Sequence, residues 1–432
     1  MRFMIAAIAL AYSALSGEPA NAQATDESAA SDATMLEKAA EQVVEVIRGE
    51  AQPEEAFAPG FLAAVPREQF AAISAQLTGQ FGPIIGVEKV EASSQYAGTI
   101  YLRFEKAIGS GNFVIEPEEP HRVTGLLLQT FEPIDDDVDK ITQDLEALPG
   151  DVSVLFAPLA AGAEPILSFN PDKQLAIGST FKLYVLATLA AEVEAGKRNW
   201  DDVIALDVKS FPSGMMQDWP QGSPVTLQTL ASLMISISDN TATDQLVRVL
   251  GREAVEGQMA KSGHSAMDPM RPLLTTLDLF KLKGDPSLAR EWLGLDQRAR
   301  RAKVAAFEAE HDWKSYTVTP PTFVEPTAIE TLEWFADMRD LAGLMRMFAE
   351  ADDDTALDVM AINPSMPPSM RQRWDYIGYK GGSEPGVLNL TWLLRDKAGA
   401  WHMLAMSWNN SQANVQSSTF ELLAQRIVAL AD

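Results

Sequence analysis

Strand patterns stand at both ends of residues 151–432, and helical patterns fill the length between them. The strand candidates, rich in β-branched and aromatic residues between turn signals, are Val152–Pro158, Pro165–Phe169, Tyr376–Lys380, Val387–Leu394 and His402–Ser407. The helical candidates are Phe181–Val193, Leu227–Ile235, Thr241–Leu250, Arg252–Lys261, Thr275–Lys283 and Thr419–Ala431. A sheet made of these strands must join distant parts of the chain, with the helices packed against it. We therefore predict an α/β domain over residues 151–432.

The chain before residue 151 predicts a smaller domain and its connections. Residues 35–132 carry two helical patterns and then strand candidates separated by Gly and Pro turns, which indicates a small α+β domain. Residues 133–150 begin with a charged stretch and continue as a helical pattern, so we expect a linker helix there. Residues 23–34 are small and polar and predict a disordered leader.

Residues 1–22 are typical of an export signal. Arg2 gives a positive start, Phe3–Leu15 is mostly apolar, and Ala20-Asn21-Ala22 has the small-x-small pattern of a cleavage site. We expect cleavage after Ala22 and a periplasmic or secreted protein. The apolar run is too short to cross a bilayer and no other segment is long enough, so we predict no membrane span.

The charge balance and the composition exclude several classes of partner. A net charge of −26 and a pI near 4.5 disfavour nucleic acid and anionic lipid surfaces. The chain has no cysteine, which excludes disulfides and thiolate metal sites. Its four histidines show no metal-ligand spacing, and no Gly-rich phosphate loop occurs. We expect a monomer that acts on a small molecule, with no cofactor and no metal.

The first candidate for chemistry is Ser179-Thr180-Phe181-Lys182, at the start of an apolar helical pattern. A spacing of three puts Ser179 and Lys182 on one helix face. A serine needs a nearby base to become a nucleophile, and a desolvated lysine with a lowered pKa can be that base. The free N–H groups at a helix start suit a developing oxyanion. Ser-x-x-Lys also occurs by chance about once in a chain of this length, so an N-capping serine with a solvated lysine remains an alternative.

The second candidate is Ser238-Asp239-Asn240, which lies between two helical patterns. Ser238 can relay a proton and Asn240 can bind a substrate amide. These residue types are also the usual ones at a helix cap or turn. The third candidate, Lys380-Gly381-Gly382-Ser383, ends a predicted strand. Gly382 lets a substrate backbone approach the strand edge, although a glycine-rich strand end without function would look the same.

The order Ser-x-x-Lys, Ser-Asp-Asn, Lys-Gly-Gly resembles that of the class A β-lactamases and penicillin-binding proteins, whose third motif is Lys-Thr-Gly. The step from Ser179 to Ser238 is 59 residues, close to the usual spacing of that family. The stretch Leu233–Thr243 also resembles the family in its amino-acid sequence. The resemblance covers residues from about 150 to 432 and implies a β-lactamase/transpeptidase-like antiparallel sheet covered by a helical subdomain.

The resemblance also implies a role for each motif residue. Ser179 would be acylated after activation by Lys182, and Ser238 would shuttle protons. Asn240 would bind the substrate amide, and Lys380 would recognise a substrate carboxylate. The backbone N–H groups of Ser179 and Ser383 would form the oxyanion hole.

Two departures from the family pattern stand out. The hydroxyl residue that usually follows the lysine of the third motif is replaced by Gly381, and Ser383 is a candidate substitute. The Glu-x-x-Leu-Asn stretch, whose glutamate activates the deacylating water in class A enzymes, does not occur between Asn240 and Lys380. Glu308, Glu310 and Glu325 are candidate replacements that the sequence does not rank. We therefore expect acylation followed by slow or atypical deacylation, with modest β-lactamase activity.

The two-domain layout resembles the β-lactamase-like proteins of clavulanic-acid gene clusters, which carry a small steroid-isomerase-like (NTF2-like) domain in front. The helix-helix-strands order of residues 35–132 is compatible with that domain, and the relation implies ester as well as lactam substrates. The front domain shows no acid/base pair of its own, so we expect it to pack against or shape the cleft.

Several functions stay open on the sequence alone. The first is a hydrolase that cleaves a β-lactam or an ester through an acyl-serine. The second is a binder of β-lactams or peptidoglycan fragments that stays acylated, which the missing glutamate favours. A D-alanyl-D-alanine peptidase and a folded but inactive relative are the remaining alternatives.

Overall fold

The structure is a computed structural model, which describes residues 8–10, 26–134, 136–211, 213–309 and 324–431. The described residues form two compact units, one drawn from the chain up to Asp137 and the other from Val138 onward. The predicted export signal lies outside the described residues except for Ile8–Leu10, which form the short strand β1. Among the described residues, no helix is long and apolar enough to cross a membrane.

The first unit combines helices with an antiparallel sheet. Its strands, in the sheet order β1-β5-β4-β3-β2, include β2 (Ile84–Ser94), β3 (Ala97–Phe104), β4 (Ala107–Ile115) and β5 (Val123–Pro133). Its helices are α1 (Asp26–Arg48), α2 (Pro53–Ala56), α3 (Pro59–Ala64) and α4 (Arg67–Phe81). α1 begins inside residues 23–34, where the sequence predicts a disordered leader. Alanine is the strongest helix former and acidic residues favour a helix start, and this stretch holds both.

The second unit is a mixed α/β structure around one antiparallel sheet, as the sequence predicts. The sheet order β12-β13-β14-β6-β7 brings the first strands of the unit beside the last ones. The strands are β6 (Asp151–Pro158), β7 (Leu167–Phe169), β12 (Trp374–Glu384), β13 (Val387–Asp396) and β14 (Trp401–Asn409). Two small pairs complete the strands: β8 (Leu175–Ala176) with β11 (Phe335–Ala336), and β9 (Val203–Ala205) with β10 (Pro224–Thr226).

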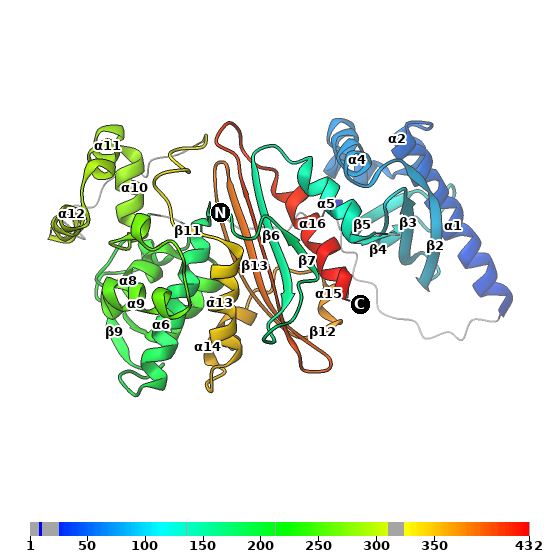
Figure 1. The fold of residues 1–432 in the computed structure, drawn as a ribbon. Coiled ribbons are helices and arrows are strands. Elements are labelled where there is room, and N and C mark those ends of the chain that lie inside the picture. Colours follow the sequence, from blue (N-terminus) through cyan, green and yellow to red (C-terminus); the bar gives the residue numbers. More distant parts are fainter. Residues whose placement is uncertain (1–7, 11–25, 135, 212, 310–323, 432) are drawn as a thin grey trace. The chain divides into compact units, whose positions relative to one another are not determined.

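Helices cover both faces of this sheet (Figure 1). One group lies on the side of the sheet away from α16 and consists of α6 (Lys182–Glu194), α7 (Leu227–Ser236), α8 (Asn240–Leu250), α9 (Arg252–Lys261), α10 (Thr276–Gly284), α11 (Pro286–Gly294), α12 (Gln297–Ala309), α13 (Met338–Ala349) and α14 (Thr355–Ala361). The other face carries α5 (Val138–Glu146) and α16 (Ser417–Val428), and α15 (Pro368–Arg371) precedes β12.

α5 is an integral part of the second unit. The sequence predicts this stretch as a linker helix, but Ile141 and Leu145 are buried in the core beneath α16. Arg426 of α16 also donates a hydrogen bond to Asp144 Oδ2 at 2.6 Å. Apolar residues at i and i+4 give α5 one buried face, which explains why the helix docks instead of bridging freely.

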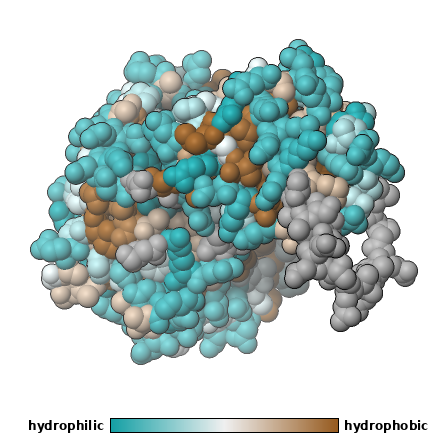
Figure 2. Space-filling view, turned by 90° about the vertical axis from the view of Figure 1, so that its right-hand side faces the viewer, coloured by the Kyte–Doolittle hydropathy of each residue, from teal (hydrophilic) through white to brown (hydrophobic). Residues whose placement is uncertain are grey.

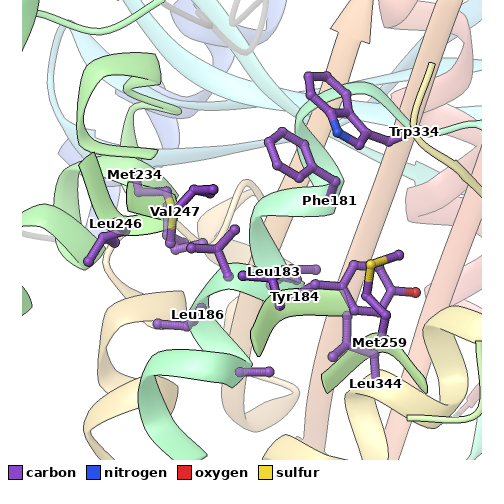
Figure 3. Close-up of a cluster of buried hydrophobic side chains, with 14 of the residues drawn as sticks. Phe181, Leu183, Tyr184, Leu186, Met234, Leu246, Val247, Met259, Trp334 and Leu344 are labelled. Atoms are coloured by element: carbon purple, nitrogen blue, oxygen red, sulfur yellow. The ribbon is translucent and has the colours of Figure 1, made fainter. Parts of the chain in front are cut away.

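α6 runs through the centre of the larger core. Its first eight residues, Lys182–Leu189, are all buried. Figure 3 shows side chains of this helix meeting partners on different sides: Leu186 lies toward Leu246, and Tyr184 lies beside Met259 and Leu344. A helix that is apolar on all sides must be buried on all sides, so α6 is fixed at both flanks.

By contrast, the face in Figure 2 is predominantly hydrophilic, with apolar residues gathered in a few patches.

β12 and the segment before α6 approach each other at backbone distance. A Cβ atom built on Gly382 would lie 2.0 Å from Ile177 O and 2.6 Å from Ser179 N. These neighbours are backbone atoms that cannot turn aside, so only glycine fits here. The close approach sets the position of Ser179 against the end of β12.

We therefore predict that Gly382→Ala lowers the free energy of unfolding by about 1–3 kcal/mol or more, because the added methyl group overlaps backbone. Gly257→Ala is the matched control, since Gly257 lies in helix α9 with no atom within 4 Å of a built Cβ. The control should gain about 0.5–1 kcal/mol from helix propensity. Urea unfolding measures both changes, and equal stability of Gly382→Ala and the parent would contradict the packing argument.

Candidate active site

Ser179 lies in a tight turn that leads into α6. The turn is η1 (Gly178–Phe181), a 3-10 helix, and α6 itself begins at Lys182. Gly178 has φ +49°, a left-handed conformation that glycine adopts without strain. Ser179 is partly exposed whereas Thr180 and Lys182 are fully buried. The turn therefore presents one hydroxyl toward solvent and directs the lysine inward.

The ammonium group of Lys182 connects the first motif to the second. Its Nζ donates to Ser238 O at 2.7 Å, to Ser238 Oγ at 3.1 Å and to Asn240 Oδ1 at 2.6 Å. These acceptors satisfy all three protons that a lysine can donate. Within the described residues, no hydrogen bond reaches Ser179 Oγ, so this hydroxyl is available to a ligand.

Ser238 has an unusual backbone conformation. Its φ is +57°, which is uncommon for a residue with a side chain and costs of order 1–3 kcal/mol. The conformation is held by Ser213 Oγ, which donates to Ser238 O at 2.7 Å, and by Lys182 at the same carbonyl. Strain of this kind persists where surrounding contacts impose it, and it often marks functional sites.

Lys380 reaches the same serine from β12. Its Nζ donates to Ser238 Oγ at 3.1 Å and also contacts Gly381 O. Ser238 Oγ thus accepts hydrogen bonds from two lysines, which occupies both of its lone pairs. Its own proton must point elsewhere, and it is free to be donated to a third group.

Burial changes the acidity of both lysines. Burial lowers the pKa of Lys182 to about 7, against the opposing effect of Asp244 and Asp239. Burial also brings the pKa of Lys380 well below its usual value, and the nearby positive charge of Lys182 lowers it further. A lysine with a pKa near 7 is half neutral at neutral pH and can accept a proton.

Asp239 holds the second motif in place. Its Oδ1 accepts from Ala242 N at 2.9 Å and caps α8, and its Oδ2 accepts from Met215 N and Met216 N at 2.7 and 2.9 Å. The side chain is fully buried. Asp239 is thus the N-cap of α8, which agrees with the helix cap that the sequence left open for this motif.

A second polar network, which the sequence does not predict, anchors the turn that holds Ser179. Thr180 Oγ1 donates to Asn389 Oδ1 at 2.8 Å, and Asn389 Nδ2 donates to Ser407 Oγ at 2.7 Å. Thr391 Oγ1 donates to the same Asn389 oxygen at 2.9 Å. The turn is thereby tied through β13 to β14. No local pattern predicts this network, because its members are up to 227 residues apart in sequence.

The end of β12 lies beside the turn that holds Ser179. Ser383 N lies 3.1 Å from a Cβ built on Gly178, and Ser179 N lies 2.6 Å from one built on Gly382. Gly381 stands where the family usually has a hydroxyl residue, and the phenol of Tyr379 fills the space of that side chain. A Cβ built on Gly381 would lie 2.2 Å from Tyr379 Oη. A threonine at this position therefore requires Tyr379 to move.

Of the three candidate replacements for the missing glutamate, Glu308 is engaged by an arginine. Glu308 accepts hydrogen bonds from the guanidinium of Arg252 between α12 and α9, at 2.6 and 2.9 Å. Glu325 is exposed, and Glu310 lies outside the described residues. Among the described residues, no group of three or more His, Asp or Glu is arranged to hold a metal ion.

Comparisons with known proteins place these features in a family. The family model described as "Beta-lactamase enzyme family" matches residues 136–427. No curated protein matches the sequence. Similar solved structures include a beta-lactamase from Sphaerobacter thermophilus, with 22% identity, covering 68% of this chain and 94% of that chain at a TM-score of 0.46. PBP-A has 18% identity, with 68% and 94% coverage and a TM-score of 0.47. A putative class A beta-lactamase from Rhodopseudomonas palustris has 15% identity, with 68% and 98% coverage and a TM-score of 0.46.

We predict that Asp239→Ala lowers the free energy of unfolding by about 2–4 kcal/mol, because it removes a helix cap and leaves buried N–H groups unpaired. Asp296→Ala is the control, since Asp296 Oδ1 accepts from Ala299 N at 2.8 Å but is exposed. Its cost should be about 1 kcal/mol or less. Urea unfolding of both variants tests this, and similar losses for the two would argue against a special role of burial.

Proposed function

The chain belongs to the beta-lactamase enzyme family, and from this we propose that it is a serine hydrolase that forms an acyl-enzyme on Ser179 with β-lactam or ester substrates. The observation that carries the proposal is the burial of Lys182 between Ser238 and Asn240, with its pKa lowered to about 7. A serine and a lysine of this kind, one helical turn apart, form a nucleophile and base pair.

Acylation would proceed by proton transfer through this pair. Neutral Lys182 takes the proton of Ser179 Oγ, and the oxygen attacks the carbonyl carbon of the substrate. The N–H groups of Ser179 and Ser383 stabilise the oxyanion that forms. Ser238 donates its proton to the leaving nitrogen or oxygen and is reprotonated by Lys182. Each proton removed from the nucleophile is thereby returned to the leaving group.

The remaining motif residues would orient the substrate. Asn240 Oδ1 accepts a hydrogen bond from Lys182 and can accept a second one from the N–H group of a substrate amide. Lys380 is almost fully buried and contacts Ser238 Oγ directly. It therefore lies behind that hydroxyl and would act on a substrate carboxylate mainly through it. Gly382 keeps the strand edge open, and Ser383, two positions after Gly381, is the candidate substitute for the missing hydroxyl residue.

A second candidate is a binding protein that acylates and releases its ligand slowly. The absence of Glu-x-x-Leu-Asn between Asn240 and Lys380 favours it, together with the contact that engages Glu308 elsewhere. A positioned general base contributes about 10²–10⁴-fold in rate. On either reading we expect weak or atypical β-lactamase activity.

We extend the proposal to the rest of the chain. Residues 1–22 would direct export to the periplasm or the medium, with cleavage after Ala22. The first unit would be the NTF2-like domain found in the β-lactamase-like proteins of clavulanic-acid gene clusters. It supplies helices and an antiparallel sheet, as such a domain requires. That relation would favour cephalosporin-type esters as substrates beside lactams, in a monomeric protein.

We expect the purified protein to gain the mass of an opened chromogenic cephalosporin and then lose it slowly, while Ser179→Ala stays unmodified. Intact-protein mass spectrometry with simultaneous absorbance follows both steps. An adduct that persists selects the binding protein. No adduct with any lactam or activated ester, or an adduct retained in Ser179→Ala, would exclude the proposed mechanism.

The acylation rate constant should rise with pH through about 7 and then level off. Below this value Lys182 is protonated and cannot accept the serine proton, so the rate should fall about tenfold per pH unit on the acid side. Stopped-flow acylation over about pH 5 to about pH 9 measures the profile. A rate that is flat across about pH 7 would remove Lys182 as the base.

A further inference from the structure

The stretch between α10 and β11 is closed at its base by a buried ion cluster. The chain departs at Lys283, forms α11 and α12, and returns at Glu333, just before β11. Lys283 Nζ donates to Glu333 Oε1 at 2.5 Å and also binds Glu384 Oε1. The side chains of Lys283, Glu333 and Glu384 are 0%, 1% and 15% exposed. A buried cluster of charges costs desolvation, so it must be compensated by geometry.

Glu384 connects the cluster to one donor of the oxyanion hole. It directly follows Ser383 in β12, and the backbone of Gly382 and Ser383 packs on the turn that holds Ser179. The position of the Ser383 N–H group therefore depends on where the cluster holds the end of β12.

Glu333 connects the cluster to the other donor. Its Oε2 accepts from Trp334 N at 3.0 Å, and Trp334 O accepts from Ile177 N at 2.9 Å, two residues before Ser179. The Trp334 ring stacks on Phe181 with centroids 3.8 Å apart (Figure 3). The cluster is thus linked to both sides of the oxyanion hole by short covalent and hydrogen-bonded paths.

The charges of the cluster balance if one glutamate is protonated. Burial raises the pKa of Glu384 well above its usual value, and the adjacent Glu333 raises it further. The two glutamates raise the pKa of Lys283 although its burial has the opposite effect. The cluster then holds one ammonium, one carboxylate and one carboxylic acid, which is neutral overall and can be buried at lower cost.

We propose that Glu384, bound by Lys283 and Glu333, is a positioning residue that sets the distance between the two N–H donors of the oxyanion hole. The inference rests on the proposed acyl-serine function and adds a residue outside the family motifs. Glu384 does not contact the reacting atoms. It acts through Ser383, so its loss should slow the attack on the carbonyl more than it weakens substrate binding.

The test compares Glu384→Ala with Glu384→Gln by stopped-flow acylation with a chromogenic cephalosporin. A displaced oxyanion donor costs about 10–100-fold in the acylation rate constant, and we expect this loss in Glu384→Ala with substrate affinity changed by less than about threefold. Glutamine has the shape and hydrogen bonding of a protonated glutamate, so Glu384→Gln should retain the rate within about threefold.

Glu291→Ala is the matched control. Glu291 accepts from Lys303 at 2.7 Å within the same α11–α12 stretch, and this pair is partly exposed. Its removal should leave acylation unchanged, and melting temperatures check that each variant is folded. Acylation by Glu384→Ala at the parent rate, or an equal loss in Glu384→Gln, would overturn the inference. If the parent chain forms no Ser179 adduct, the proposed function itself fails and the inference falls with it.

Discussion

Lys182 is fully buried, and its Nζ is held by the backbone and side chain of Ser238 and by Asn240. This contact joins α6 to the loop between α7 and α8, and Lys380 extends it to β12 through Ser238 Oγ. A buried ammonium without acceptors would be strongly unfavourable. The contacts that satisfy the buried Lys182 amine therefore also hold the helical subdomain against the sheet, whereas burial itself lowers the pKa of this lysine.

The precision of the site comes from backbone packing. Gly382 lets β12 approach the turn at Ser179 more closely than any side chain allows. The network of Thr180, Asn389 and Ser407 ties the same turn to β13 and β14. Donors placed in advance for a developing charge need no reorganisation during reaction. The strained φ of Ser238 is maintained in the same way, because contacts formed by the fold hold a conformation that the residue would otherwise avoid.

The region between the second and third motifs departs from the family pattern. A charged helical stretch stands where the family's deacylating loop is expected, and Lys283 and Glu333 close its base. A second departure, Gly381, is accommodated by the phenol of Tyr379. Neither change involves the contacts that join Lys182 to Ser238 and Asn240. Such a distribution fits a protein whose acyl-enzyme is made in the usual manner and released in a different one.

The sequence by itself determined the α/β class, the segments of the sheet and the identity of the motif residues. It could do so because strand patterns, helix starts and short motifs are local signals. It predicted a disordered leader where α1 begins and a linker where α5 packs, since docking of a helix depends on a partner surface that local composition does not reveal.

Only the tertiary structure decided the electrostatics and the supporting contacts. The lowered pKa of Lys182 results from burial by residues of distant segments. The pairing of Lys283 with Glu384 spans 101 residues, and that of Thr180 with Asn389 spans 209. No spacing rule connects positions so far apart. A sequence carries the residue types that a reaction needs, whereas their protonation states and distances arise when the folded chain excludes water around them.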